Sequence, residues 1–164
     1  MYSSNLSSHL NTDWNSQNYA LLELSAKVEY ALLALLELAK QHDKKVPLTI
    51  NEIAAKQPIP ERYLEQILAQ LRRAGMVQSQ RGSKGGFVLM NDPWQITVLE
   101  IVTLVEGERK EKESTETRTL EKALILEVWA KANTASIEVL RGYTLQDLYQ
   151  ETETRSQNSP MYYI

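Results

Sequence analysis

Residues 80–89, QRGSKGGFVL, place three glycines, a serine and two cations within six consecutive positions. Arg81 and Lys84 carry charges that pair with phosphate oxygens, and Ser83 carries a hydroxyl that can donate to one. Glycines lack a Cβ, so they allow a tight turn or a close approach of the backbone to a ligand. Two kinds of site fit these residues: a loop that cradles the phosphates of a nucleotide, and a β-hairpin tip that contacts a nucleic acid.

The surrounding residues favour the hairpin. A nucleotide P-loop needs a strand before it, a helix after it, and a lysine followed by Ser or Thr. Here Lys84 is followed by two glycines and then by the β-prone segment FVLM at 87–90, so no helix N-terminus is placed to receive a phosphate. The segment MVQSQ at 76–80 supplies the other strand. The alternative is a plain hairpin whose charges are incidental.

Two helices joined by a short turn precede this hairpin. The segment TINE at 49–52 is a capping box, and the helix that it starts ends near Gln57, before Pro58. A second helix begins near Pro60, since proline suits the first helical position, and Gly75 follows it as the C-cap. Its apolar stripe comprises Tyr63, Leu64, Ile67, Leu68 and Leu71. Two such helices followed by a hairpin predict a winged helix-turn-helix, whose second helix can lie in a DNA major groove.

Helices are also predicted on both sides of this unit. One spans 25–40 and is apolar nearly all round, one starts at the capping box of Thr97 and Glu100, and a long one spans 120–141. A short helix begins at Thr144. The predicted fold is therefore mainly α with a two-stranded β wing. Its parts are an N-terminal extension (1–23), a winged helix-turn-helix domain (24–107), a charged loop with the long and short helices (108–150) and a polar tail (151–164).

Composition excludes several classes of protein. The chain has 164 residues, a net charge of −3 and no cysteine, which rules out disulfides and thiolate metal sites. Its two histidines lie far apart, no run is apolar enough for a membrane span, and no signal peptide is evident, so we expect a cytoplasmic protein. Residues 61–86 nevertheless carry five basic and two acidic side chains, a local excess of the kind that DNA-binding surfaces show.

The chain resembles the Rrf2 family of bacterial winged-helix regulators, which includes the IscR-, NsrR- and CymR-like proteins. The resemblance covers roughly residues 24–150. It rests on LSAKVEYALLALLELA, IAAKQPIPERYLEQILAQLRRAGMVQSQRGSKGGFVL and ITVLEIVTLVEG, which stand in the family's order and spacing. It implies a homodimeric transcription factor that reads a palindromic operator in double-stranded DNA and dimerises through the long helix after the wing.

The resemblance also implies which residues contact DNA and the partner copy. The DNA contacts fall on Lys27 in the first helix, on Arg62, Glu65 and Gln66 in the recognition helix, and on Arg81, Ser83 and Lys84 in the wing. The apolar stripe of the long helix comprises Leu120, Leu124, Val128, Ala132, Ala135 and Val139. Glu65 could accept a hydrogen bond from a cytosine amino group or be an ordinary exposed charge. Lys27 is a phosphate contact or a solvated lysine, and Tyr63 and Leu64 fit the core better than a DNA contact.

One departure from the family stands out. Cluster-binding members place three cysteines in the loop and early dimer helix, whereas in this chain two ligand positions fall on Ala123 and Leu126. Iron–sulfur ligation of the family type is therefore not open to this chain, and we expect no cofactor and no metal. The effector is left open as an unknown partner protein or small molecule.

The sequence thus predicts a sequence-specific DNA-binding transcriptional regulator that acts as a homodimer. No catalytic constellation is present, so an enzyme is not expected. The alternative is an adaptor that keeps the winged fold for protein binding and does not bind DNA. Salt-dependent binding to duplex DNA distinguishes the two.

Overall fold

The computed structural model of the protein describes residues 21–107 and 119–158. Three stretches of the sequence interpretation lie outside these residues. They are the N-terminal extension as far as residue 20, the charged segment 108–118, and the tail from residue 159. Among the described residues, no helix combines the length and apolar character that crossing a lipid bilayer requires.

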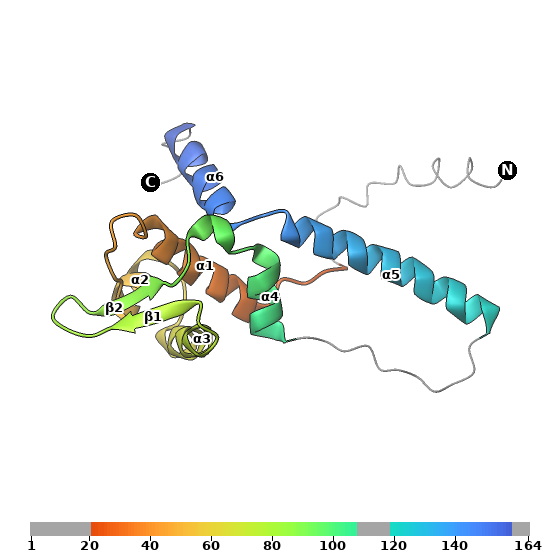
Figure 1. The fold of residues 1–164 in the computed structure, drawn as a ribbon, viewed down its shortest axis with the longest axis horizontal. Helices are drawn as coiled ribbons and strands as arrows, with labels where there is room; N and C mark the ends of the chain where they lie inside the picture. The colour runs from red at the N-terminus through yellow and green to blue at the C-terminus, as the bar shows by residue number, and fades with distance from the viewer. Residues whose placement is uncertain (1–20, 108–118, 159–164) are drawn as a thin grey trace.

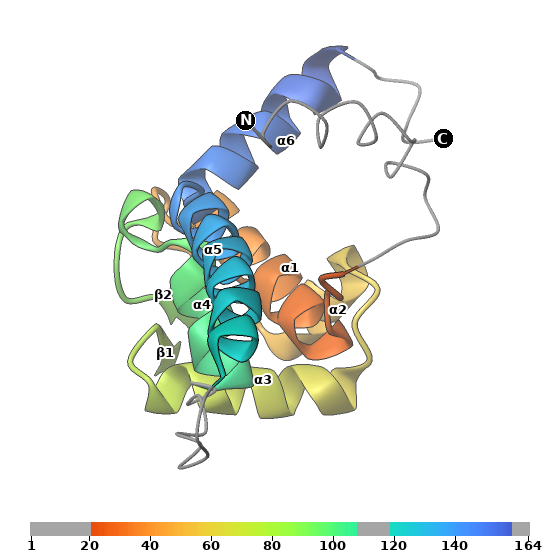
Figure 2. The same ribbon diagram turned by 90° about the vertical axis from the view of Figure 1, so that its right-hand side faces the viewer.

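Helix α1 (Ala26–Lys40) is the centre of the fold, with α2, α3, β2, α4 and α6 packed around it (Figures 1 and 2). It begins at Ser25, whose hydroxyl accepts a hydrogen bond from the Val28 amide at 3.2 Å. Ala31, Ala34 and Leu35 are fully buried. Small and branched apolar residues on several faces let other elements approach α1 from different sides, which accounts for the nearly all-round apolar character of this segment.

Helices α2 (Ile50–Lys56) and α3 (Glu61–Arg73) form the helix-turn-helix. Thr49 caps α2 as predicted, and Leu64, Ile67, Leu68 and Leu71 of α3 are buried. Two details were predicted wrongly. Pro60 is the N-cap of α3 and not its first helical residue, because its carbonyl accepts from Tyr63 and Leu64 while its own ψ is extended. Tyr63 is 52% exposed, because the helical turn carries it to the edge of the apolar face.

Strands β1 (Val77–Gln80) and β2 (Gly86–Leu89) pair antiparallel, with Gln80 opposite Gly86 at the turn. The other edge of β2 is joined to the chain just before α2, where Leu48 and Phe87 exchange two backbone hydrogen bonds of 3.1 and 2.7 Å. This pairing requires Gly86. A Cβ at that position would lie 2.5 Å from the Leu48 carbonyl carbon and oxygen, and its φ of +146° also suits glycine alone.

After the hairpin, a short 3₁₀ turn, η1 (Pro93–Gln95), leads into α4 (Val98–Glu106). The predicted capping box of Thr97 and Glu100 is present at the start of α4. Helix α6 (Leu145–Asn158) continues eight residues past the predicted end at Gln150. The polar residues of this extension support one another along the helix, since Arg155 pairs with Glu151 at 2.9 Å.

Helix α5 (Leu120–Arg141) has the predicted bounds, with Thr119 as its N-cap and Gly142 as its C-cap. It has no buried residue, although it is the longest of the described helices. It contacts α4 and otherwise projects away from the rest of the molecule (Figures 1 and 2). A helix with wide apolar surface and so little cover is unusual for an isolated chain.

Candidate nucleic-acid interface

The outward face of α3 is polar and basic. Residues spaced three or four apart lie on one side of a helix, so Arg62, Gln66 and Arg73 share a face, with Glu65 beside them. All four side chains are exposed, whereas the opposite face of α3 is buried in the core. This face has the length and donor and acceptor groups that reading base edges in a major groove requires.

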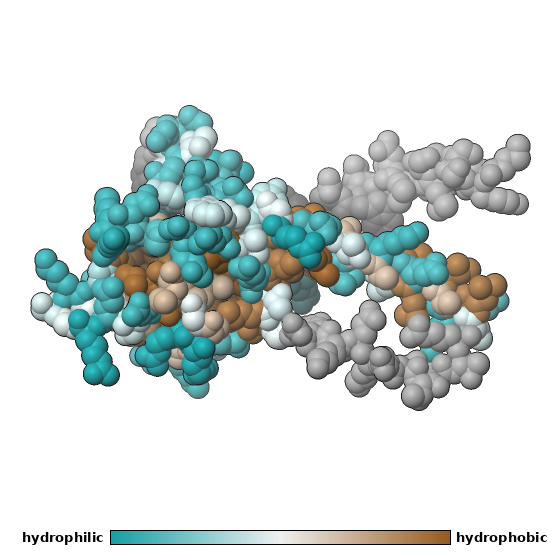
Figure 3. Space-filling view, in the orientation of Figure 1, coloured by the Kyte–Doolittle hydropathy of each residue, from teal (hydrophilic) through white to brown (hydrophobic). Residues whose placement is uncertain are grey.

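The hairpin turn carries the predicted wing residues Arg81, Ser83 and Lys84, which are all exposed. The hairpin lies at one end of the molecule, where Figure 3 shows a mostly hydrophilic surface. The turn closes with a backbone hydrogen bond of 3.0 Å from the Gly85 amide to the Gly82 carbonyl. The two cations are therefore held at the tip of a paired ribbon and face solvent.

Two hollows flank the hairpin, and two cationic side chains line each of them. The α2-side hollow, about 460 Å³, lies between the chain before α2 and the hairpin tip. It is lined by Lys45, Val46, Pro47, Thr49, Glu52, Gly82, Ser83, Lys84 and Gly85. The α3-side hollow, about 430 Å³, lies between the end of α3 and β1. It is lined by Arg72, Gly75, Val77, Gln78, Ser79, Arg81 and Met90.

Lys27, the predicted contact of the first helix, is exposed in the first turn of α1. One turn later, the ring of Tyr30 lies 6.0 Å from that of Tyr63, measured between ring centroids. This end of α1 is therefore beside the first turn of α3. The structure places Lys27 near the same end of the recognition helix as Arg62 and does not bring it to the wing.

Three basic residues of this surface are absent from the predicted DNA contacts. Arg72 and Arg73 count toward the basic excess of residues 61–86 without an individual role, and Lys45 is given none. The structure places Arg73 on the outward face of α3, Arg72 beside Arg81, and Lys45 beside Lys84. The helical spacing of Arg62, Gln66 and Arg73 could have identified Arg73. The other two depend on contacts between distant parts of the chain.

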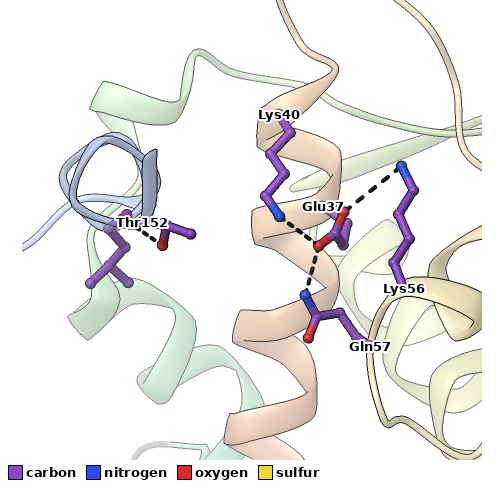
Figure 4. Close-up of polar contacts among 6 residues, drawn as sticks. Glu37, Lys40, Lys56, Gln57 and Thr152 are labelled. Carbon is purple, nitrogen blue, oxygen red and sulfur yellow. Dashed lines mark hydrogen bonds and ion pairs between the residues drawn. The ribbon is translucent and has the colours of Figure 1, made fainter. Parts of the chain in front are cut away.

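A buried carboxylate joins α1 to the helix-turn-helix (Figure 4). Glu37 is 2% exposed and accepts hydrogen bonds from Lys40 Nζ at 2.8 Å and Gln57 Nε2 at 2.7 Å, with Lys56 Nζ 4.0 Å away. Burial raises the pKa of this carboxyl, but the Lys40 and Gln57 hydrogen bonds and the two lysine charges lower it by more. The pKa of Glu37 therefore lies below its ordinary value. We call these four residues the Glu37 cluster.

Apolar side chains on α5 remain uncovered. Figure 3 shows hydrophobic surface along this helix, including the end farthest from the core. Of the predicted dimer stripe, Leu120, Leu124, Val128 and Val139 are more than half exposed, and Ala132 and Ala135 are also exposed. Trp129 is 69% exposed on the adjoining side. So many large apolar side chains exposed along one helix are uncommon on a monomeric protein.

Helix-turn-helix, hairpin and helical core together define a winged helix-turn-helix protein, and comparison with known proteins agrees. Residues 24–151 match the Rrf2 family, described as iron-dependent transcriptional regulators. The regulator CymR of Bacillus subtilis is 37% identical over 143 residues, which cover 87% of this chain and the whole of that protein. Its solved structure superposes with a TM-score of 0.69 over 80% of this chain and 98% of that one.

A second solved structure, IscR of T. potens, also gives a TM-score of 0.69, with 34% identity over 82% of this chain and 90% of that one. The family match over residues 24–151 includes the wing and α5 and is not limited to one motif. The chain belongs to the Rrf2 family of transcriptional regulators.

The residues of this chain do not fit the iron site that the family's description implies. The full sequence has no cysteine. In the parts of the chain that the structure describes, no three His, Asp or Glu side chains gather in a way that could hold a metal ion. Ala123 and Leu126, at the expected ligand positions, lie on α5 and offer only hydrocarbon.

Proposed function

We propose that this Rrf2-family regulator binds duplex DNA sequence-specifically in the cytoplasm, as a homodimer without an iron–sulfur cluster. The observation that carries the proposal is the joint placement of the outward face of α3 and the cationic hairpin. A recognition helix reads base edges, while charged residues around it hold the phosphates and fix its register. No described acid pairs with Arg62, Arg81 or Lys84, so these charges are free for a ligand.

Roles follow for the individual residues. Arg62 and Gln66 present donor and acceptor groups to base edges in the major groove, and Glu65 accepts a hydrogen bond from a cytosine amino group. Arg81 enters the neighbouring minor groove, and Ser83 and Lys84 hold phosphates. Lys27 reaches a phosphate near the start of α3.

The uncovered apolar stripe of α5 supports the dimer. A copy related by a two-fold axis presents the same stripe in return, which is the simplest way to cover it. Such a dimer would set two α3 helices about one turn of DNA apart, roughly 34 Å, and would match a palindromic operator. The absence of thiolates points to control by a partner protein or a small molecule, and not by a cluster.

Selection of genomic fragments on the purified protein, followed by sequencing, tests the proposal. A shared palindrome with half-sites one turn apart is expected, with affinity that falls steeply as salt rises. Failure to retain any duplex at low salt would contradict DNA binding and leave a protein-binding role for the fold.

Two wing variants then separate base reading from attraction to phosphate. Arg81→Ala should weaken binding to the selected duplex by about 1–3 kcal/mol and relax its preference over random DNA. Lys84→Ala should weaken binding to both duplexes similarly and reduce the salt slope by about one. If neither variant changes affinity while circular dichroism shows an intact fold, the wing does not contact DNA.

A further inference from the structure

The two hollows lie on opposite edges of the hairpin. Leu48 pairs with Phe87 on the outer edge of β2, and α3 packs beside β1. The order across this layer is therefore the chain before α2, then β2, then β1, then α3. Lys45 consequently flanks one edge of the ribbon and Arg72 flanks the other.

The cations of the hollows have no partner within the described residues. Lys40, Arg141 and Arg155 each form an ion pair closer than 3 Å with an acid on their own helix. Within residues 21–107 and 119–158, none of the four cations that line the hollows forms an ion pair: Lys45, Lys84, Arg72 and Arg81. The α3-side hollow has no acid in its lining, and the α2-side hollow has one, Glu52. Both hollows thus present unneutralised positive charge.

The loop that carries Lys45 is held firmly in place. Lys45 has a φ of +53°, which makes it the one non-glycine residue with positive φ in the described parts of the chain. That conformation is unfavourable for a lysine by roughly 1 kcal/mol. The loop is fixed on one side by His42, whose Nε2 lies 2.7 Å from Asp92 Oδ1, and on the other by the Leu48–Phe87 pairing. The Lys45 side chain is therefore presented from a defined backbone.

The geometry of duplex DNA indicates which DNA strand would lie at each edge of the hairpin. Neighbouring major and minor grooves share one sugar–phosphate strand, and the second strand of the minor groove lies beyond it. With α3 in a major groove and the hairpin in the adjoining minor groove, the shared strand must cross the surface where α3 meets β1. That is the place of the α3-side hollow, and the second strand then falls on the far edge, at the α2-side hollow.

We propose that the hairpin is gripped by both strands of one minor groove. Arg72, beside Arg81 at the α3-side hollow, binds a phosphate of the strand shared with the major groove, while Arg81 itself reaches into the minor groove. Lys45 and Lys84 bind phosphates of the opposite strand. This inference rests on the proposed DNA binding and adds Lys45 and Arg72 as positioning residues. Two separate anchors fix the depth and tilt of the hairpin, which a single phosphate contact cannot do.

The test combines charge removal on the protein with charge removal on each DNA strand. The probe is the duplex selected by the protein, made with a neutral methylphosphonate in place of one phosphate at a time along both strands. Lys45→Gln and Arg72→Gln should each lower the salt slope on the unmodified duplex by about one. Lys44→Gln, which removes the neighbouring exposed charge outside the hollow, serves as the matched control and should have a smaller effect.

Strand assignment is the decisive result. When the methylphosphonate lies in the shared strand, Arg72→Gln should no longer weaken binding. When it lies in the opposite strand, Lys45→Gln should no longer weaken binding. Glu52→Gln should strengthen binding, because it removes the acid from the α2-side hollow. If wild-type protein binds the duplex but both variants couple to the same strand, or to neither, the two-strand grip is wrong while DNA binding stands. If wild-type protein shows no salt-dependent binding, both proposals fail.

Discussion

Replacing Glu37 by glutamine tests how α1 is fastened to the helix-turn-helix. Glu37→Gln keeps the size of the side chain and an oxygen that can accept from Lys40 and Gln57, but it removes the charge. The new amide nitrogen would face the ammonium of Lys56, which cannot accept a hydrogen bond. The variant therefore isolates the charge of the Glu37 cluster from its packing.

The size of the effect follows from the contacts. Hydrogen bonds to a charged group contribute about 1.5–3 kcal/mol, and neutral ones about 0.5–1.5 kcal/mol. The bond from Gln57 changes from the first kind to the second, and Lys40 and Lys56 lose an ionic partner. Both lysines are partly exposed and stay hydrated, so the loss should fall short of that for a fully buried pair. We expect about 2 kcal/mol, a fall in Tm of roughly 4–8 °C.

The direction of the Glu37 pKa shift determines how its contribution to stability changes with pH. The pKa of Glu37 in the folded protein lies below that of an unfolded glutamate, which is about 4.3. Its charge therefore stabilises the fold fully above that pH, and the stabilisation disappears as the pH falls through the folded-state pKa. The difference between wild type and Glu37→Gln should be constant near neutrality and shrink in acid.

Urea unfolding followed by circular dichroism, at fixed protomer concentration between pH 3.5 and 7, measures this difference. Glu138→Gln is the matched control, because Glu138 also pairs with a cation three residues later, Arg141 at 2.7 Å, but both side chains are exposed. Its cost should be below about 1 kcal/mol. If the two variants lose the same stability, or if the Glu37→Gln difference does not change with pH, the buried charge is not what stabilises this contact.

Three further predictions concern the hairpin, the dimer and the effector. Gly86→Ala should destabilise the fold by about 1–3 kcal/mol in thermal unfolding, because its Cβ meets the Leu48 carbonyl. Gly75→Ala is the control: its φ of +78° also strains an alanine, but its Cβ would meet open space, so it should cost less, and equal losses would contradict the close approach. Changing Leu124 and Val128 together to Glu should give monomers in sedimentation velocity, and an unchanged dimer would show that α5 is not the interface. Anaerobic reconstitution with iron and sulfide should leave the visible spectrum flat, and stoichiometric iron with cluster absorbance would refute the inference from the missing thiolates.

Much of the fold could be predicted because the signals are local. Thr49 and Thr97 cap helices within one turn of themselves, and Gly142 ends α5 at the predicted residue. The apolar period of α3 and the glycines between two β-prone runs likewise act over a few residues. The existence and order of the helices and the hairpin could therefore be predicted from the sequence, although α6 extends eight residues beyond its predicted end. The lack of thiolate ligands follows from the sequence directly.

Only the tertiary structure decided which distant segments of the chain contact one another. Lys45 reaches the wing because Leu48 pairs with Phe87, 39 positions later. Arg72 meets Arg81 because α3 packs beside β1, and Glu37 is satisfied by Gln57 from the turn after α2. No local pattern encodes such neighbours, since they depend on how the apolar faces of all the elements pack around α1 at once. The packing of the core therefore determines which charged side chains lie around the wing.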